Sequence, residues 1–100
     1  MAFEAEFEAP LWRWNDGSWQ FVTVPAEISD QIDDLVPDKA GFGSVKVTVT
    51  IGPVTWSTSV FPSKEEAAFV LPVKKAVRVK NEVDEGDTVR VHLRVDLASR

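Results

Sequence analysis

The chain of 100 residues is 44% hydrophobic and 27% charged, a composition typical of one globular domain, here residues 1–100. The absence of cysteine excludes a disulfide framework and thiolate chemistry, and a formal net charge of −5 disfavours nucleic acid as a partner. No apolar run approaches the ~20 residues that span a bilayer, and the acidic N-terminal stretch is unlike a signal peptide, so we expect a cytoplasmic protein without membrane contact.

The N-terminal quarter of the chain predicts a strand followed by a hairpin. Apolar and acidic side chains alternate over residues 3–9, as a half-buried strand requires. The stretch Asn-Asp-Gly-Ser at 15–18 is a turn signal, because Asp-Gly tolerates the positive φ angles of tight hairpins. It joins residues 11–14 to a second strand at 19–24.

A first helix is predicted after Pro25, which suits the first helical position because its missing N–H has no partner there. Ile28, Ile32 and Leu35 follow at helical spacing and predict an apolar stripe that faces the core. Pro37 is expected to end this helix.

The clearest strand of the sequence lies at 45–51, where valines and an isoleucine alternate with polar residues. Gly52 and Pro53 turn the chain into a further strand at 54–61. One face of that strand is predicted to carry four side chains, namely Val54, Trp56, Thr58 and Val60.

The C-terminal part repeats the order of strand, helix and strand. A strand at 67–71 leads to Pro72, which is predicted to open a second helix with Val73, Ala76 and Val77 pointing inward. Asn81 is expected to end this helix in the left-handed conformation that asparagine tolerates. Residues 84–87 then turn the chain into a last alternating strand at 89–97.

The segments 21–28 and 69–78 share one pattern, a strand that runs into a proline and then into a helix-like stretch. Each is followed by a turn and a long alternating strand. This internal repeat predicts a mainly β fold with two short helices. We expect a small double-split β-barrel built from two pseudo-repeated β-α-β halves, with the helices capping its ends.

Four stretches carry a resemblance to a known family: Trp19-x-Phe21-Val22-x-Val24-Pro25, Trp56-x-Thr58-Ser59, Leu71 to Arg78, and Glu85-Gly86-Asp87-Thr88-Val89. With them the chain resembles family nineteen-oh-five of the domains of unknown function over nearly its whole length. The proline, short helix, Gly-Asp and strand of the last two stretches are also similar to the swapped-hairpin motif of AbrB-type and MazE-type proteins. The resemblance implies a bacterial protein with a double-split barrel capped by helices, and it implies no particular activity.

A cluster of basic residues on or beside the second helix is the first candidate binding site: Lys74, Lys75 and Arg78, with Lys80 near its end. Arginine supplies bidentate geometry and lysine a point charge for a phosphate, a carboxylate or the acidic face of a partner. The alternative is a solvated helix face with no ligand. The first helix is acidic, so helices that cap opposite ends would give the molecule one acidic and one basic end. Such ends would permit weak head-to-tail association of an otherwise monomeric protein.

The tryptophans form the second candidate site. Trp12, Trp14 and Trp19 cluster around the predicted turn, where Trp12 and Trp14 share one strand face and can pair across the hairpin with Trp19. One interpretation is that Trp19 and Trp56 fill the core of a small barrel. The other is that Trp12 and Trp14 stay partly exposed and form a recognition surface, where tryptophan is over-represented.

These features predict a non-enzymatic binding module for an anionic small molecule or a protein partner, with no catalytic residue, metal or cofactor. Two alternatives stay open. One is an AbrB-like DNA-binding regulator, by analogy of fold. The other is a small enzyme acting on an anionic substrate, which would need a concave site that joins Lys74, Arg78 and either a carboxylate or His92.

Overall fold

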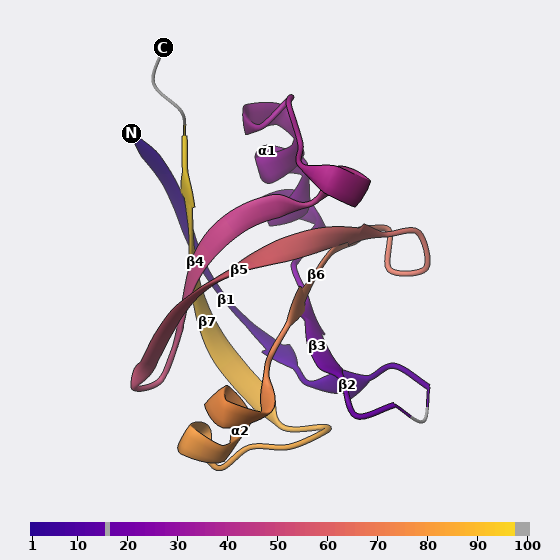
Figure 1. The fold of residues 1–100 in the computed structure, drawn as a ribbon, viewed down its shortest axis with the longest axis vertical. Coiled ribbons are helices and arrows are strands. Elements are labelled where there is room, and N and C mark those ends of the chain that lie inside the picture. Colours follow the sequence, from indigo (N-terminus) through magenta and orange to yellow (C-terminus); the bar gives the residue numbers. More distant parts are fainter. Residues whose placement is uncertain (16, 98–100) are drawn as a thin grey trace.

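A computed structural model describes residues 1–15 and 17–97, so Asp16 of the predicted turn lies outside the described residues. Figure 1 shows a strongly curled sheet with one helix at each end of the molecule. In chain order the elements are β1 (Ala2–Pro10), β2 (Trp12–Arg13), β3 (Gln20–Thr23), α1 (Ala26–Leu35), a 3-10 turn η1 (Gly41–Gly43), β4 (Val45–Ile51), β5 (Val54–Ser63), β6 (Ala68–Pro72), α2 (Lys75–Asn81) and β7 (Thr88–Asp96).

The strands form one antiparallel sheet in the order β1-β7-β4-β5-β6-β3-β2. Its two edge strands, β1 and β2, follow one another in the chain and are joined by the buried Leu11. The Leu11 N–H donates to the Asp87 carbonyl (2.9 Å), and the Leu11 carbonyl accepts from the Gly86 N–H (2.8 Å). The sheet therefore curls until its edges adjoin, which confirms the predicted mainly β, barrel-like fold with two helices.

The internal repeat of the sequence corresponds to two similar halves of the sheet. In one half β3 leads through α1 to β4, and in the other β6 leads through α2 to β7. Strand β3 pairs with β6, so that Val22 lies opposite Leu71, and β4 pairs with β7, so that Val49 lies opposite Leu93. The two halves thus interlock strand against strand, with α1 and α2 at opposite ends (Figure 1).

The core lies inside the curl of the sheet and is made mainly of valine. Inward-facing side chains alternate with solvent-facing ones along β4 and β7, as a period of two requires. Removing one such aliphatic side chain from water contributes about 1.5–3 kcal/mol to folding. The residues with no exposed surface are Val22, Val24, Ile32, Val49, Val60, Leu71, Val73, Val77, Val91 and Leu93.

The start of α2 differs from the prediction. Pro72 is the last residue of β6, and the helix begins at Lys75 after an extended Lys74. The cause is the pairing with β3, which continues past Pro72 because the Val73 N–H donates to the Gln20 carbonyl (2.9 Å). Val73 is buried as predicted, but Ala76 is exposed, so its predicted inward orientation is wrong.

The end of α2 differs as well. Asn81 lies within the helix, and Glu82 takes the left-handed conformation with φ 55°. The Asn81 side chain is instead used as a tether, because its Nδ2 donates to the Ile51 carbonyl (3.1 Å) and to the Val77 carbonyl (3.0 Å). This amide fastens α2 to the end of β4.

Helix α1 packs on the sheet through a face that the sequence predicts only in part. Ile32 is buried and Ile28 half-buried, but Leu35 is 46% exposed, so its predicted core position is wrong. The reason is that the buried face is centred between Ile32 and Ser29, and at 100° per residue Leu35 lies on its rim. Val36 packs against the core in its place.

Ser29 connects α1 to the sheet by two buried hydrogen bonds. Its Oγ donates to the Val24 carbonyl (3.1 Å) and accepts from the Phe69 N–H (3.0 Å). We expect Ser29→Ala to lower the free energy of unfolding by about 1–2 kcal/mol, because the Phe69 N–H then stays buried without an acceptor. Urea denaturation measures the change, and the exposed Gln31→Ala in the same helix is the matched control. An equal loss in both variants would contradict this role of the hydroxyl.

Candidate functional site

Strand β5 is long and changes its neighbour halfway along. Residues 54–60 pair with β4 only, whereas Phe61, Pro62 and Ser63 pair with β6. Beyond this short ladder β6 leaves β5 and pairs with β3. The barrel is therefore split along one edge of β5, and Figure 1 shows β5 and β6 diverging from their common end.

A groove of about 400 Å³ lies at this split. Four aromatic side chains and one cation face it, because the first half of β5 lies on one side and the ends of β3 and β6 lie on the other. The groove is lined by Trp19, Phe21, Trp56, Ser57, Thr58, Phe61, Pro72 and Lys74. We refer to these eight residues as the aromatic groove.

Each wall of the aromatic groove follows from the local fold. Trp56 is half-buried and packs against the core, while Phe61 marks the point where the two strands part. Phe21 lies opposite Pro72 in the β3–β6 ladder. Lys74 is extended and exposed between β6 and α2, because the continued pairing delays the start of the helix.

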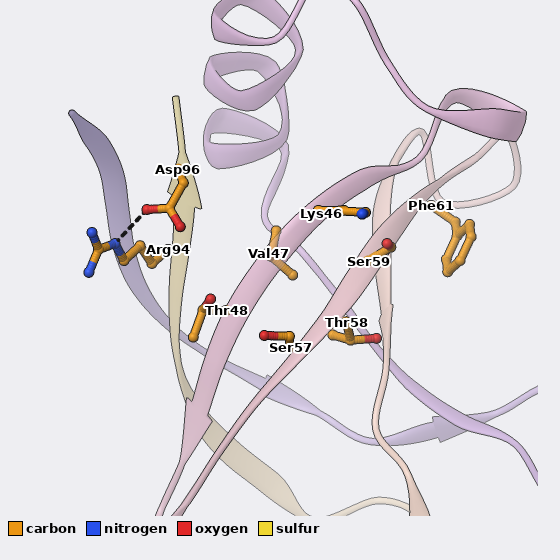
Figure 2. A pocket seen from close by; sticks show the side chains of 9 residues that line it. All are labelled: Lys46, Val47, Thr48, Ser57, Thr58, Ser59, Phe61, Arg94 and Asp96. Carbon is orange, nitrogen blue, oxygen red and sulfur yellow. Dashed lines mark hydrogen bonds and ion pairs between the residues drawn. The ribbon is translucent and has the colours of Figure 1, made fainter. Parts of the chain in front are cut away.

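A second depression, of about 630 Å³, lies on the other side of β5 over β4 and β7. It shares Ser57, Thr58 and Phe61 with the aromatic groove. Its remaining lining is polar or basic apart from Val47: Lys46, Thr48, Ser59, Arg94 and Asp96. Figure 2 shows Ser57 and Thr58 directed to opposite sides of β5, and it shows Arg94 joined to Asp96 by a 3.0 Å hydrogen bond from Nε to Oδ1. We refer to this surface as the polar depression.

The hairpin register confirms the predicted tryptophan pairing for Trp14, whose N–H donates to the Trp19 carbonyl (3.3 Å), but not for Trp12. Trp12 lies opposite Phe21 and stacks on it with ring centroids 5.1 Å apart, while its Nε1 donates to Thr23 Oγ1 (2.9 Å). Trp14 is 46% exposed and lies 6.3 Å from Trp12. Neither Trp12 nor Trp14 lines the aromatic groove, but Trp12 stacks on Phe21 and Trp14 is bonded to Trp19, and these two partners do line it.

The two tryptophans expected in the core behave differently from each other. Trp56 does pack against the core, but Trp19 is 59% exposed, so its predicted core role is wrong. The reason is that Gln20 takes the inward position at the start of β3 and leaves Trp19 at the solvent-facing end of the hairpin. Trp19 is thus exposed to solvent where it lines the aromatic groove.

The predicted basic cluster is dispersed by the structure. Lys74 lines the aromatic groove, whereas Lys75 and Arg78 line a separate depression that also contains Glu82, Asp84 and Asp87. The cations of this segment therefore do not all face one depression, and two of them share theirs with three carboxylates.

Arg78 has a structural role that the sequence does not reveal. Its Nε donates to the Val73 carbonyl (3.2 Å), its Nη2 donates to the Ser18 carbonyl (3.4 Å), and its Nη1 lies 3.9 Å from Asp84 Oδ1. The side chain is only 14% exposed. Arg78 therefore holds the β2–β3 turn beside α2 and so supports the position of the neighbouring Trp19.

Asp84 completes this network. Its Oδ1 accepts from Gln20 Nε2 (2.7 Å) and from the Glu85 N–H (2.8 Å). The Gln20 hydrogen bond, the Glu85 amide and the nearby Arg78 charge together lower the pKa of Asp84 from its usual 3.8. The carboxylate thus stays ionised at neutral pH as a fixed acceptor between β3, α2 and the turn before β7.

The residues considered for catalysis lie apart from each other. His92 Nε2 lies 2.9 Å from Glu4 Oε1 on the outer face of the β1–β7 ladder, whereas Lys74 faces the aromatic groove. Over the described parts of the chain, no three His, Asp or Glu side chains gather closely enough to hold a metal ion. Neither of the described helices has the length and apolar character needed to cross a membrane.

Comparison with known proteins identifies one family. The model of a family described as Domain of unknown function (DUF1905) matches residues 7–93. The matched segment contains every residue of the aromatic groove. No curated protein shows significant similarity to the chain.

Proposed function

The chain belongs to the family described as Domain of unknown function (DUF1905), and for this member we propose a non-enzymatic binding module whose ligand site is the aromatic groove. The observation that carries the proposal is the convergence of Trp19, Phe21, Trp56 and Phe61 with a single lysine, Lys74. These side chains come from three separate segments, residues 19–21, residues 56–61 and Lys74, so only the folded chain brings them together.

The lining indicates the chemistry of the ligand. Aromatic rings bind flat apolar groups by stacking and edge contacts worth about 0.5–1.5 kcal/mol for each pair. Among the described residues Lys74 has no ion-pair partner, so its ammonium group is available to a carboxylate or phosphate. The ligand is therefore an apolar or aromatic group that carries a negative charge.

A titration with naphthoate and its neutral analogue naphthamide tests the proposal. We expect naphthoate to bind more tightly, and Lys74→Ala to weaken it about tenfold, which corresponds to about 1.4 kcal/mol. Lys75→Ala is a matched control, because Lys75 is also exposed but lies outside the groove. Calorimetry measures the affinity, and the indole N–H resonances locate the ligand.

A second pair of variants separates groove binding from general adhesion to tryptophan. Trp19→Ala removes a groove wall, whereas Trp14→Ala removes an exposed indole that does not line the groove. Only the first substitution is expected to weaken naphthoate. Equal losses in both, or equal losses in the two lysine variants, would contradict the assignment of the site.

A further inference from the structure

The free edge of β5 carries none of the features that usually protect a sheet edge. Proteins guard such edges with charged side chains, prolines or bulges, because unpaired N–H and C=O groups recruit another strand. The edge strand β1 is guarded by Glu4, Glu6 and Glu8, and β2 has only two residues. By contrast residues 54–60 read Val-Thr-Trp-Ser-Thr-Ser-Val and contain no charge and no proline. This stretch is open to pairing.

The backbone groups that face the split can be assigned from the hairpin. Ile51 lies opposite Val54 across the two-residue turn Gly52–Pro53, and such flanking pairs exchange both backbone hydrogen bonds. The bonds to β4 then alternate along β5. The N–H and C=O groups of Thr55, Ser57 and Ser59 therefore point away from β4 toward the split.

The two depressions meet at β5: the aromatic groove lies at its free edge, and the polar depression extends from β5 over β4 and β7. Successive side chains of a strand point to opposite faces, so a strand added to β5 would alternately place its side chains in the aromatic groove and on the face of Ser57 and Ser59, at the border of the polar depression. The groove takes apolar side chains. The polar depression offers hydroxyls and the exposed Lys46, while its one carboxylate, Asp96, is already bonded to Arg94.

We propose that the partner is an extended peptide with alternating apolar and acidic residues, which pairs as an additional strand with residues 54–60 of β5. Lys46, which lies on the face opposite the groove, supplies the charge complementarity to its acidic side chains. This inference rests on the proposed function, since the apolar residues of the peptide occupy the aromatic groove. It adds main-chain hydrogen bonds as the source of affinity.

The experiment uses a display library of random peptides of about ten residues, the upper length of an ordinary strand, selected on the full chain. Enriched peptides are expected to alternate apolar and acidic residues. In synthetic copies, N-methylation of alternate amides on one register should weaken binding at least tenfold, because those amides face β5, while methylation of the other register has little effect. Amide exchange of Thr55, Ser57 and Ser59 should slow on binding, whereas that of Trp56 and Thr58, already bonded to β4, should change little.

Other outcomes would overturn the inference: an unproductive selection, enriched peptides without alternation, or equal effects of both methylation registers. Ser57→Pro removes the Ser57 N–H, a donor that faces the split and makes no bond to β4, so the substitution should abolish peptide binding. If the proline variant does not fold, Ser57→Lys tests the same edge with a charged side chain. Failure here is distinct from failure of the proposed function. If naphthoate binds through Lys74 but no peptide pairs with β5, the groove stands as a small-molecule site and strand addition is excluded.

Discussion

Gly52→Ala is expected to lower the free energy of unfolding by about 3 kcal/mol, although the substitution only adds a methyl group and removes no contact. Gly52 has φ 55°, where an alanine costs about 1–2 kcal/mol. A Cβ at this position would also collide with the Asn81 amide, whose Oδ1 lies well inside contact distance and whose Cγ lies at 3.1 Å. Overpacking of this kind adds about 1–3 kcal/mol.

A double-mutant cycle separates the two causes. Asn81→Ala alone should cost about 1–2 kcal/mol, because it removes the bonds to the Ile51 and Val77 carbonyls. In that background Gly52→Ala has no amide to displace, so only the backbone strain should remain. Chemical denaturation of the four proteins gives the coupling energy. Strictly additive losses would show that the turn and α2 are independent of each other.

Arg78→Ala is expected to lower the free energy of unfolding by about 2–3 kcal/mol rather than to weaken ligand binding directly. The substitution removes three contacts of a largely buried guanidinium, to Val73, Ser18 and Asp84, and hydrogen bonds of a charged group are worth about 1.5–3 kcal/mol. Arg78→Lys should recover little of this loss, because a single ammonium cannot reproduce the planar fork. Exposed Lys80→Ala in the same helix is the control, and thermal denaturation is the measurement.

The pH dependence of stability gives an independent check on the same network. The pKa of Asp84 is lowered in the folded chain by the Gln20 hydrogen bond, the Glu85 amide and Arg78. Its contribution is therefore complete above the unfolded value of 3.8 and is lost as the pH falls through the lower folded value. Asp84→Asn should flatten the stability profile below about pH 4. An unchanged acid limb would show that the carboxylate is not coupled to folding.

Periodicity is sufficient to predict most of the strands, because the alternation of apolar and polar residues can be seen in the sequence itself. Residues 45–51 and 89–95 alternate in the sequence and bury the same faces in the structure. The errors lie where tertiary pairing decides. Pro72 suggests the start of a helix, but the pairing of Val73 with Gln20 keeps the chain extended. Trp19 is predicted in the core, but Gln20 occupies the inward-facing position instead.

The candidate site was harder to predict than the fold, because no local pattern encodes the split. The charge of Lys74 indicates a binding residue, but its neighbours in the groove come from β3 and β5, which only the strand order brings together. The charge of Arg78 indicates the same role, whereas its side chain is engaged in contacts within the fold. A single sequence does not distinguish a guanidinium that is free to bind an anion from one that already contacts three oxygen atoms of the same chain, as Arg78 does.

The junction at Leu11 has a consequence for how quickly this chain can fold. The hairpin of β4 and β5 joins residues that are close in sequence, so it is expected to form early because its loop-closure entropy cost is small. The contacts of Leu11 with Gly86 and Asp87, in contrast, join residues near opposite ends of the chain. Folds dominated by such non-local contacts reach the native state in milliseconds to seconds rather than microseconds. Closure of the sheet is therefore expected to be a late, rate-limiting event.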